Sequence, residues 1–222
     1  RCGALMYLCN STRPDMAYTT HLLCRAMQRP TPALMTEVDI ALNYIERTRS
    51  LGITYSPARS ELHGLSDASW ETRHSTSGWV IFWQRAPISW GSRRQHSIAL
   101  SSCESELMAL SEAAKDMVYF RKLIGGLDAS FISGPTALGT DNTGARNLSY
   151  NPEHHDRSKH IERRHFYVRD MVEKMEISVP FVPTELNVAD IFTKPLKPKR
   201  FVQLRRALMG ETGAASPPVS GE

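Results

Sequence analysis

Leu62-His63-Gly64-Leu65-Ser66-Asp67-Ala68-Ser69-Trp70 is the stretch of this sequence that decides the fold. Its apolar and small residues predict a short buried strand, yet the strand carries an acid, Asp67. Aspartate disfavours strands, and a buried carboxylate is costly unless a hydrogen-bond donor or a metal ion pairs with it. Asp67 therefore directs attention to acids at comparable places, and the chain has three of them: Glu106, Asp141 and Asp190.

Composition limits the class of protein. The chain has 222 residues, enough for one large domain or for a small domain with an appendage, and its 41% of apolar residues supports a packed core. The net charge of +4 permits a polyanionic partner without requiring one. No apolar run approaches the ~20 residues that span a bilayer, so we expect no membrane partner. The four cysteines lack paired metal spacing, and neither a signal peptide nor an initiator Met opens the chain; we expect an intracellular piece of something longer.

Residues 1–58 predict a helical appendage. Apolar residues recur at helical spacing, and Pro14 and Pro32 each lie in the first turn of an expected helix. Residues 53–55 could form an edge strand, and the polar connection after them marks the predicted domain boundary. Nothing in this part of the sequence carries chemistry.

Residues 59–209 predict an alternation of strands and helices. In chain order we expect strands at 62–70, 78–83 and 88–92, a helix at 101–124, a strand at 136–140, a short helix after 141, a helix at 157–175, a strand at 177–182, a short helix around 190 and a last helix at 198–209. A meander followed by a strand–helix–strand crossover gives an α/β fold, a mixed five-stranded sheet flanked by helices. Residues 210–222 are rich in Gly, Ala, Ser and Pro and are expected to be a disordered tail.

The four acids occupy places where this topology can bring them together. If the first and fourth strands are neighbours, Asp67 and Asp141 project close together at one edge of the sheet, and the starts of two helices bring in Glu106 and Asp190. Any one acid alone is more often a cap or a surface charge. Four carboxylates in one place repel each other unless cations neutralise them, and oxygen ligands favour hard ions, so Mg²⁺ (or Mn²⁺) is the expected cofactor.

Two such ions about 4 Å apart form the clamp used in phosphodiester cleavage, where one activates water and the other stabilises the leaving oxygen. Asp67 is the expected bridging ligand of the two ions. Glu106 and Asp141 are expected to hold the ion on the leaving-group side, with Asp141 also orienting the substrate. Asp190 is expected to hold the ion beside the attacking water.

Several motifs resemble, in order and spacing, the ribonuclease H domain of copia-type (Pseudoviridae-like) LTR retrotransposon Pol polyproteins. They include Ser66-Asp67-Ala68-Ser69-Trp70, Ser75-Thr76-Ser77-Gly78-Trp79, Ile88-Ser89-Trp90, Ser101-Ser102-Cys103-Glu104-Ser105-Glu106, Asp141-Asn142, Lys159-His160-Ile161 and Ala189-Asp190-Ile191-Phe192-Thr193-Lys194-Pro195-Leu196. The resemblance implies the ribonuclease H-like fold and endonucleolytic cleavage of the RNA strand of RNA/DNA hybrids during reverse transcription.

The resemblance also assigns residues and partners. The family's metal-binding acids match Asp67, Glu106, Asp141 and Asp190; Glu106 rather than Glu104 is the match because it precedes Leu107-Met108-Ala109. Residues 1–58 look like the thumb or connection end of the preceding reverse transcriptase, which is therefore an expected partner, and a cytoplasmic virus-like particle is the expected location. Cellular ribonucleases H carry a His in the loop before the last acid, whereas residues 183–187 contain none.

Basic and polar residues around the acids are candidates for nucleic-acid binding, because they could contact phosphates and the 2′-hydroxyls that distinguish RNA from DNA. Each of them could equally be a solvated surface charge. The candidates are Arg93, Arg94, Asn142, Arg157, Lys159, His160, Lys194, Lys197, Lys199 and Arg200.

Three functions compete. The complete acid set favours a metal-dependent nuclease. A chain without the polymerase palm could instead be a non-catalytic fragment of a decayed or domesticated element that binds nucleic acid or supports a polymerase. An integrase-like polynucleotidyl transferase is the weakest alternative, because that class of enzyme would not need both of the acids Glu106 and Asp190.

Overall fold

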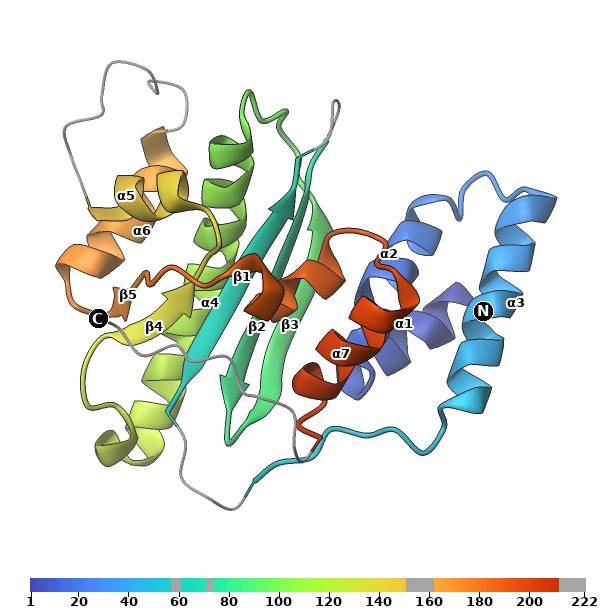
Figure 1. Ribbon diagram of the computed structural model, residues 1–222, viewed down its shortest axis with the longest axis horizontal. Helices are drawn as coiled ribbons and strands as arrows, with labels where there is room; N and C mark the ends of the chain where they lie inside the picture. The colour runs from blue at the N-terminus through green and yellow to red at the C-terminus, as the bar shows by residue number, and fades with distance from the viewer. Residues whose placement is uncertain (57–60, 71–73, 151–161, 212–222) are drawn as a thin grey trace.

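A mixed five-stranded sheet forms the centre of the molecule, as predicted (Figure 1). The computed structural model describes residues 1–56, 61–70, 74–150 and 162–211. The strands lie in the order β3-β2-β1-β4-β5. β1 (His63–Ser69), β2 (Thr76–Trp83) and β3 (Ala86–Arg94) form an antiparallel meander, whereas β4 (Thr136–Gly139) runs parallel to both β1 and β5 (Ile177–Ser178). A two-residue turn of Gln84 and Arg85, both with positive φ, joins β2 to β3, as tight hairpins require.

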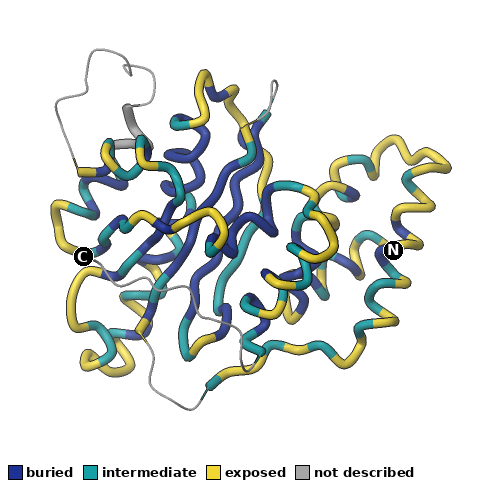
Figure 2. The backbone as a smooth tube through the Cα atoms, viewed as in Figure 1, coloured by how far each residue is buried: buried dark blue, intermediate teal, exposed yellow. Residues whose placement is uncertain are grey.

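Helices cover both faces of the sheet because β2 is apolar on both sides. Trp79 and Ile81 point into a core shared with α4 (Ser102–Leu127) and α6 (Glu162–Glu173). Val80 and Phe82 point the other way, into a core shared with the 3-10 helix η5 (Val188–Phe192) and α7 (Pro198–Leu208). Figure 2 shows the resulting buried centre of the sheet. The short helix α5 (Thr143–Tyr150) follows β4.

The N-terminal helices pack against the side of this body near β3 and α7 (Figure 1). They are α1 (Cys2–Ser11), the 3-10 helix η1 (Pro14–Met16), α2 (Ala17–Arg25) and α3 (Pro32–Arg47). They have a small core of their own around Leu5, Leu23 and Val38. Cys9 also belongs to the core beneath α7, and its carbonyl accepts a hydrogen bond of 2.9 Å from the Trp90 indole. The appendage therefore shares a core with the sheet, and the division at residue 58 stays a prediction.

Three secondary-structure predictions were wrong in detail. Residues 53–55 form no strand; instead the Thr54 amide donates to the Met209 carbonyl. The helix expected at 101–124 continues through Gly125 and Gly126 to Leu127. The strand expected at 177–182 is only Ile177–Ser178, with one further bridge between Thr140 and Phe181, because Pro180 has no N–H to donate to a ladder.

Three further expectations meet the limits of the described residues. The helix expected at 157–175 is described only from Glu162, and residues 157–161 lie outside the described part. Most of the predicted disordered tail, 212–222, also lies outside it, whereas Glu211 pairs with Arg206 at 3.5 Å. Among the described residues no helix is both long enough and apolar enough to cross a bilayer.

Candidate metal centre

Asp67 and Asp141 meet because their strands are parallel neighbours. Leu65 of β1 pairs with Gly139 of β4, so two residues further along each strand the register brings Asp67 beside Asp141. Asp67 is buried at 2% exposure within β1, whereas Asp141 is half-buried just past the end of β4. The sequence-based expectation about strand order therefore places these two acids correctly.

Two glutamates in the first turns of α4 have different environments. The Ser101 hydroxyl accepts from the Glu104 amide at 3.1 Å, and Glu104 Oε2 accepts from the Leu100 amide at 2.6 Å, so Glu104 is a helix-capping residue. Glu106 turns toward the Asp67 end of β1 and accepts a hydrogen bond from the Ala68 backbone. Its Oε2 atom is buried and has no hydrogen-bond partner among the described residues.

Asp67, Glu106 and Asp141 form a compact carboxylate cluster. Each can offer one oxygen, and these oxygens all lie within 4.8 Å of one another. Burial and the charges of Asp67 and Asp141 raise the pKa of Glu106 to about 9. Burial raises the pKa of Asp67 to about 6, with Lys194 opposing the shift and Asp190 adding to it. Two of the three acids thus resist ionisation unless a cation joins them.

The cluster fits a divalent metal ion. Its donors are all carboxylate oxygens, which hard cations such as Mg²⁺ and Mn²⁺ prefer. The unpartnered Glu106 Oε2 leaves one buried acceptor free for such an ion. The chemistry of the donor set and this free oxygen therefore both favour a cation.

Asp190 does not join the three acids. Lys194 Nζ lies 2.7 Å from Asp190 Oδ1, and Arg200 Nη2 lies 3.4 Å from Oδ2. Lys194 Nζ also lies 3.9 Å from Asp67 Oδ2. Burial lowers the pKa of Lys194, but the charges of Asp67 and Asp190 outweigh it and raise the pKa overall. The fourth predicted acid is therefore beside the cluster, already paired with two cations.

The segment that carries Asp190 is docked closely on the sheet. Asn187 caps η5: its Oδ1 accepts from the Ala189 amide, and its Nδ2 donates to the Ser66 carbonyl at 3.0 Å. The Phe192 carbonyl accepts from Ser92 at 2.6 Å. A Cβ atom at Gly78 would lie 2.6 Å from Thr193, so only glycine permits this approach. These contacts fix the position of Asp190 relative to Asp67.

Two threonines near the acids were not predicted. The Thr193 hydroxyl, fully buried, donates to Asp67 Oδ2, and the Thr184 hydroxyl donates to Asp141 Oδ2 at 2.8 Å. Thr193 lies in the motif that contains Asp190, and Thr184 lies in the loop of residues 183–187, which lacks the His of cellular ribonucleases H. Neither has a signal of its own in the sequence, because each meets its acid only through the folding of distant segments.

The predicted nucleic-acid-binding residues have varied surroundings. Lys197 and Lys199 are exposed, whereas Arg200 donates to the Thr184 and Glu185 carbonyls as well as to Asp190. Asn142 Oδ1 accepts from the Ala145 amide at 2.9 Å, at the start of α5. Three further candidates lie outside the described residues: Arg157, Lys159 and His160.

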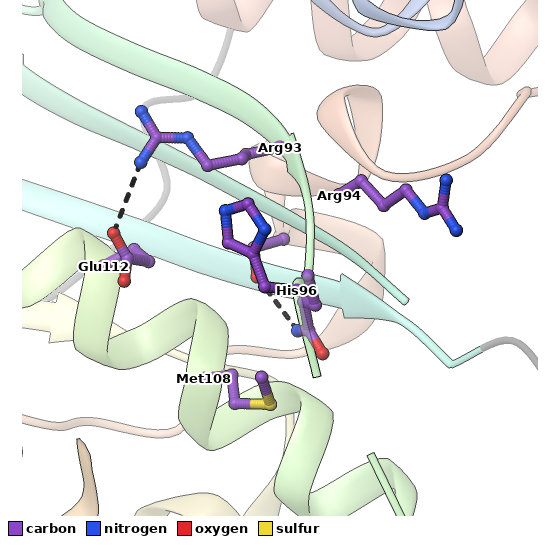
Figure 3. A pocket seen from close by; sticks show the side chains of 7 residues that line it. Arg93, Arg94, His96, Met108 and Glu112 are labelled. Carbon is purple, nitrogen blue, oxygen red and sulfur yellow. Dashed lines mark hydrogen bonds and ion pairs between the residues drawn. The ribbon is translucent and has the colours of Figure 1, made fainter. Parts of the chain in front are cut away.

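Arg93 and Arg94 line a hollow between the end of β3 and α4, which contributes Met108 and Glu112 (Figure 3). Arg93 Nη1 lies 3.6 Å from Glu112 Oε2, and its guanidinium lies 5.7 Å from the centre of the Trp79 ring. His96 is a further lining residue. The buried Gln95 amide donates to Ser77 at 2.9 Å and to the Ser105 carbonyl at 2.8 Å, which ties the hollow to the turn of α4 that carries Glu106.

Comparison with known proteins identifies relatives of the chain. It is 31% identical over 211 residues to the "Retrovirus-related Pol polyprotein from transposon RE2" of Arabidopsis thaliana, a match that covers 93% of this chain and 14% of the polyprotein. It is 32% identical over 204 residues to the corresponding polyprotein from transposon RE1 of the same plant, a match that covers 90% of this chain and 14% of that polyprotein. The chain thus spans about one seventh of these relatives (14%). No family model matches it.

Among solved structures, LC11-RNase H1 in complex with an RNA/DNA hybrid is 11% identical, with a TM-score of 0.45, over 60% of this chain and 94% of that one. The predicted α/β architecture, a mixed five-stranded sheet flanked by helices, is confirmed. The chain is therefore homologous to a segment of the retrovirus-related Pol polyproteins of transposons, as its resemblance to the copia-type family predicted.

Proposed function

We propose that this chain is a divalent-metal-dependent endonuclease that hydrolyses the RNA strand of RNA/DNA hybrids. The observation that carries the proposal is the convergence of Asp67, Glu106 and Asp141, whose oxygens lie within 4.8 Å of one another. A structural role would require partners for these buried acids, yet Glu106 Oε2 has none among the described residues. Bound Mg²⁺ would supply an activated water and a stabilised leaving oxygen.

The chain's own residues hold the cluster in place. Thr193 donates to Asp67, and Thr184 donates to Asp141, so each hydroxyl orients one carboxylate. The Ala68 backbone does the same for Glu106. Carboxylates held in this way are pre-organised for metal ions, because less rotational freedom is lost when an ion binds.

The basic hollow supports a polyanionic substrate. Arg93, Arg94 and His96 line this hollow (Figure 3). The hydrogen bond from Gln95 to the Ser105 carbonyl connects it to the turn of α4 that carries Glu106, so the backbone of a strand bound at the acids could continue into the hollow. Guanidinium groups bind phosphates with charge-assisted hydrogen bonds. We propose that this hollow contacts the hybrid, and that Lys197 and Lys199, both exposed, bind the hybrid as well.

We also propose that residues 1–58 are the end of the preceding reverse transcriptase and that 59–209 are the nuclease. The relatives that match are Pol polyproteins, and the match extends through both parts. The N-terminal helices would then connect the nuclease to the polymerase, with the element's virus-like particle as the location.

The test is cleavage of an end-labelled RNA/DNA hybrid in Mg²⁺, with Asp67→Asn and Glu106→Gln compared with the wild type. We expect each variant to lose at least ~100-fold in rate, the usual order for removing a group that organises charge in a reaction centre. Glu104→Gln is the matched control, because Glu104 and Glu106 are both 7% exposed on the same helix, and Gln can still accept from the Leu100 amide.

The outcomes separate the competing functions. Cleavage that both variants lose and the control keeps would establish the nuclease, and single-stranded RNA and duplex DNA would test the choice of substrate. Equal rates in Glu106→Gln and Glu104→Gln would contradict the assignment of the cluster. A folded wild type that binds the hybrid without cutting it would select the non-catalytic alternative.

A further inference from the structure

Lys194 occupies an unusual position beside the carboxylate cluster. Its Nζ atom lies 2.7 Å from Asp190 and 3.9 Å from Asp67. Both carboxylates are buried, at 3% and 2% exposure, and would repel each other without a cation nearby. The ammonium group of Lys194 therefore stands beside both of them, where a metal ion bridging them would have to bind.

The two cations at Asp190 differ in how firmly they are held. Arg200 also donates to the backbone carbonyls of Thr184 and Glu185, which anchor its guanidinium. Lys194 has a flexible side chain that is 41% exposed, and its ion pairs are with the two carboxylates. Lys194 can thus leave toward solvent without breaking the backbone contacts that hold this segment, whereas Arg200 cannot.

The acids consequently divide into two sides. On one side Asp67, Glu106 and Asp141 converge, and a buried Glu106 oxygen lacks a hydrogen-bond partner among the described residues. On the other side Asp190 is neutralised by Lys194 and Arg200. A divalent ion can bind the first side at once, but binding between Asp67 and Asp190 requires Lys194 to move.

We propose that Lys194 is an internal counter-ion that makes the two metal positions unequal, so that a second ion binds between Asp67 and Asp190 only when Lys194 is displaced. This inference rests on the proposed metal-dependent function. Lys194 is then a positioning residue, whose charge delays occupancy of one side of the site. A phosphate of the bound substrate strand is a suitable new partner for the displaced ammonium group, which would couple second-ion binding to the presence of substrate.

The test is a calorimetric titration of Mn²⁺ into the nucleic-acid-free protein. We expect the wild type to bind one ion and a second at least ~10-fold more weakly, since the Lys194 ammonium competes for the same carboxylates. Lys194→Gln should tighten the weaker ion by at least ~10-fold and leave the tighter ion nearly unchanged. Lys197→Gln, which removes the same charge from an exposed position three residues further along, should tighten neither ion by more than about twofold.

A charge-retaining variant guards against a folding defect. Lys194→Arg should fold and bind Mn²⁺ as the wild type does, and thermal unfolding of every variant verifies the fold. Two equal sites in the wild type, or the same isotherm for Lys194→Gln and Lys197→Gln, would overturn the role of Lys194. If Lys194→Gln does not fold, a Lys194→Arg isotherm with a tightened second ion would overturn it too.

Hybrid cleavage separates this inference from the proposed function. A wild type with two unequal Mn²⁺ sites that cuts no hybrid would refute the nuclease and leave the role of Lys194 standing. A wild type that cuts the hybrid with two equal sites would do the reverse. A folded protein that binds no Mn²⁺ would refute both.

Discussion

Two groups of buried carboxylates in this molecule differ in their partners. Asp15, in the N-terminal helices, has a fully buried side chain (0% exposed) and accepts from Arg13 at 2.9 and 2.8 Å and from the Tyr44 hydroxyl at 2.7 Å. At the end of the sheet, Glu106 has one oxygen without a hydrogen-bond partner among the described residues. Asp15 thus has its counter-charge in Arg13, whereas Glu106 forms no ion pair with the residues that the structure describes.

The difference distinguishes a structural acid from a binding acid. A buried ion pair with a full set of hydrogen bonds holds elements together, and Asp15 and Tyr44 connect η1, α3 and, through Arg205, α7. Buried carboxylates without cations instead cost stability until a ligand arrives. Burial alone therefore does not indicate a functional acid; the proposed role of Glu106 rests on burial together with a missing partner and with the two other acids of the cluster.

Among the variants that test this difference, Asp15→Ala should have the largest effect on stability. The substitution leaves the Arg13 guanidinium buried without its carboxylate, and we expect the free energy of unfolding to fall by about 3–5 kcal/mol. Urea unfolding followed by circular dichroism measures it. Asp39→Ala is the control, because the Arg1–Asp39 pair is exposed (59% and 57%) and should contribute less than ~1 kcal/mol. Similar losses for both variants would contradict the structural role of Asp15.

Glu106→Gln should raise the free energy of unfolding of the metal-free protein, whereas Asp15→Ala lowers it. Because the folded-state pKa of Glu106 is raised from 4.5 to about 9, folding favours the protonated acid, and the wild type loses stability as the pH rises between these values. The neutral amide avoids this loss. At pH 8 in EDTA we expect Glu106→Gln to be more stable than the wild type by roughly 1–3 kcal/mol, and by little at pH 4.

Thermal unfolding across pH 4–9 checks this prediction, and Mg²⁺ sharpens it. Added Mg²⁺ should raise the melting temperature of the wild type more than that of Glu106→Gln, because the variant lacks one ligand. Glu104→Gln serves as the control on the same helix and should show no such gain. A wild-type stability that is flat between pH 5 and 9 would show that Glu106 does not resist ionisation.

The structure explains how much of the site the sequence could predict. The sequence predicted that Asp67 and Asp141 meet if the first and fourth strands are neighbours, and the parallel pairing of β1 with β4 fulfils that condition. The crossover helix before β4 predicts a parallel strand, but it does not say which strand β4 joins. The choice of Glu106 over Glu104 came from the family resemblance, and the capping role of Glu104 supplies its physical reason. The shortened last strand also had a signal, since Pro180 stands within it.

Contacts between distant segments could not be predicted. Thr193 reaches Asp67 across 126 positions of sequence, and no local pattern marks such a pair. Lys194 and Arg200 were predicted to bind nucleic acid from their charge, but the fold also places them against Asp190. Charge shows that a residue will seek an anion; only the tertiary structure shows whether that anion belongs to the chain or to a ligand.

Tyr44→Phe should have the smallest effect on stability, because it removes only one of the partners of Asp15. The variant removes the hydroxyl that donates to Asp15 and accepts from Arg205 at 3.2 Å, but it keeps both Arg13 hydrogen bonds and the edge-on contact of the ring with Phe201. Asp15 therefore remains ion-paired, and we expect a loss of ~1 kcal/mol in urea unfolding, the usual value for one hydrogen bond. Tyr55→Phe is the control, since Tyr55 is 53% exposed and water can replace its bond to the Pro87 carbonyl. A loss as large as that of Asp15→Ala would mean that the hydroxyl, rather than the Arg13 ion pair, is what satisfies the buried acid.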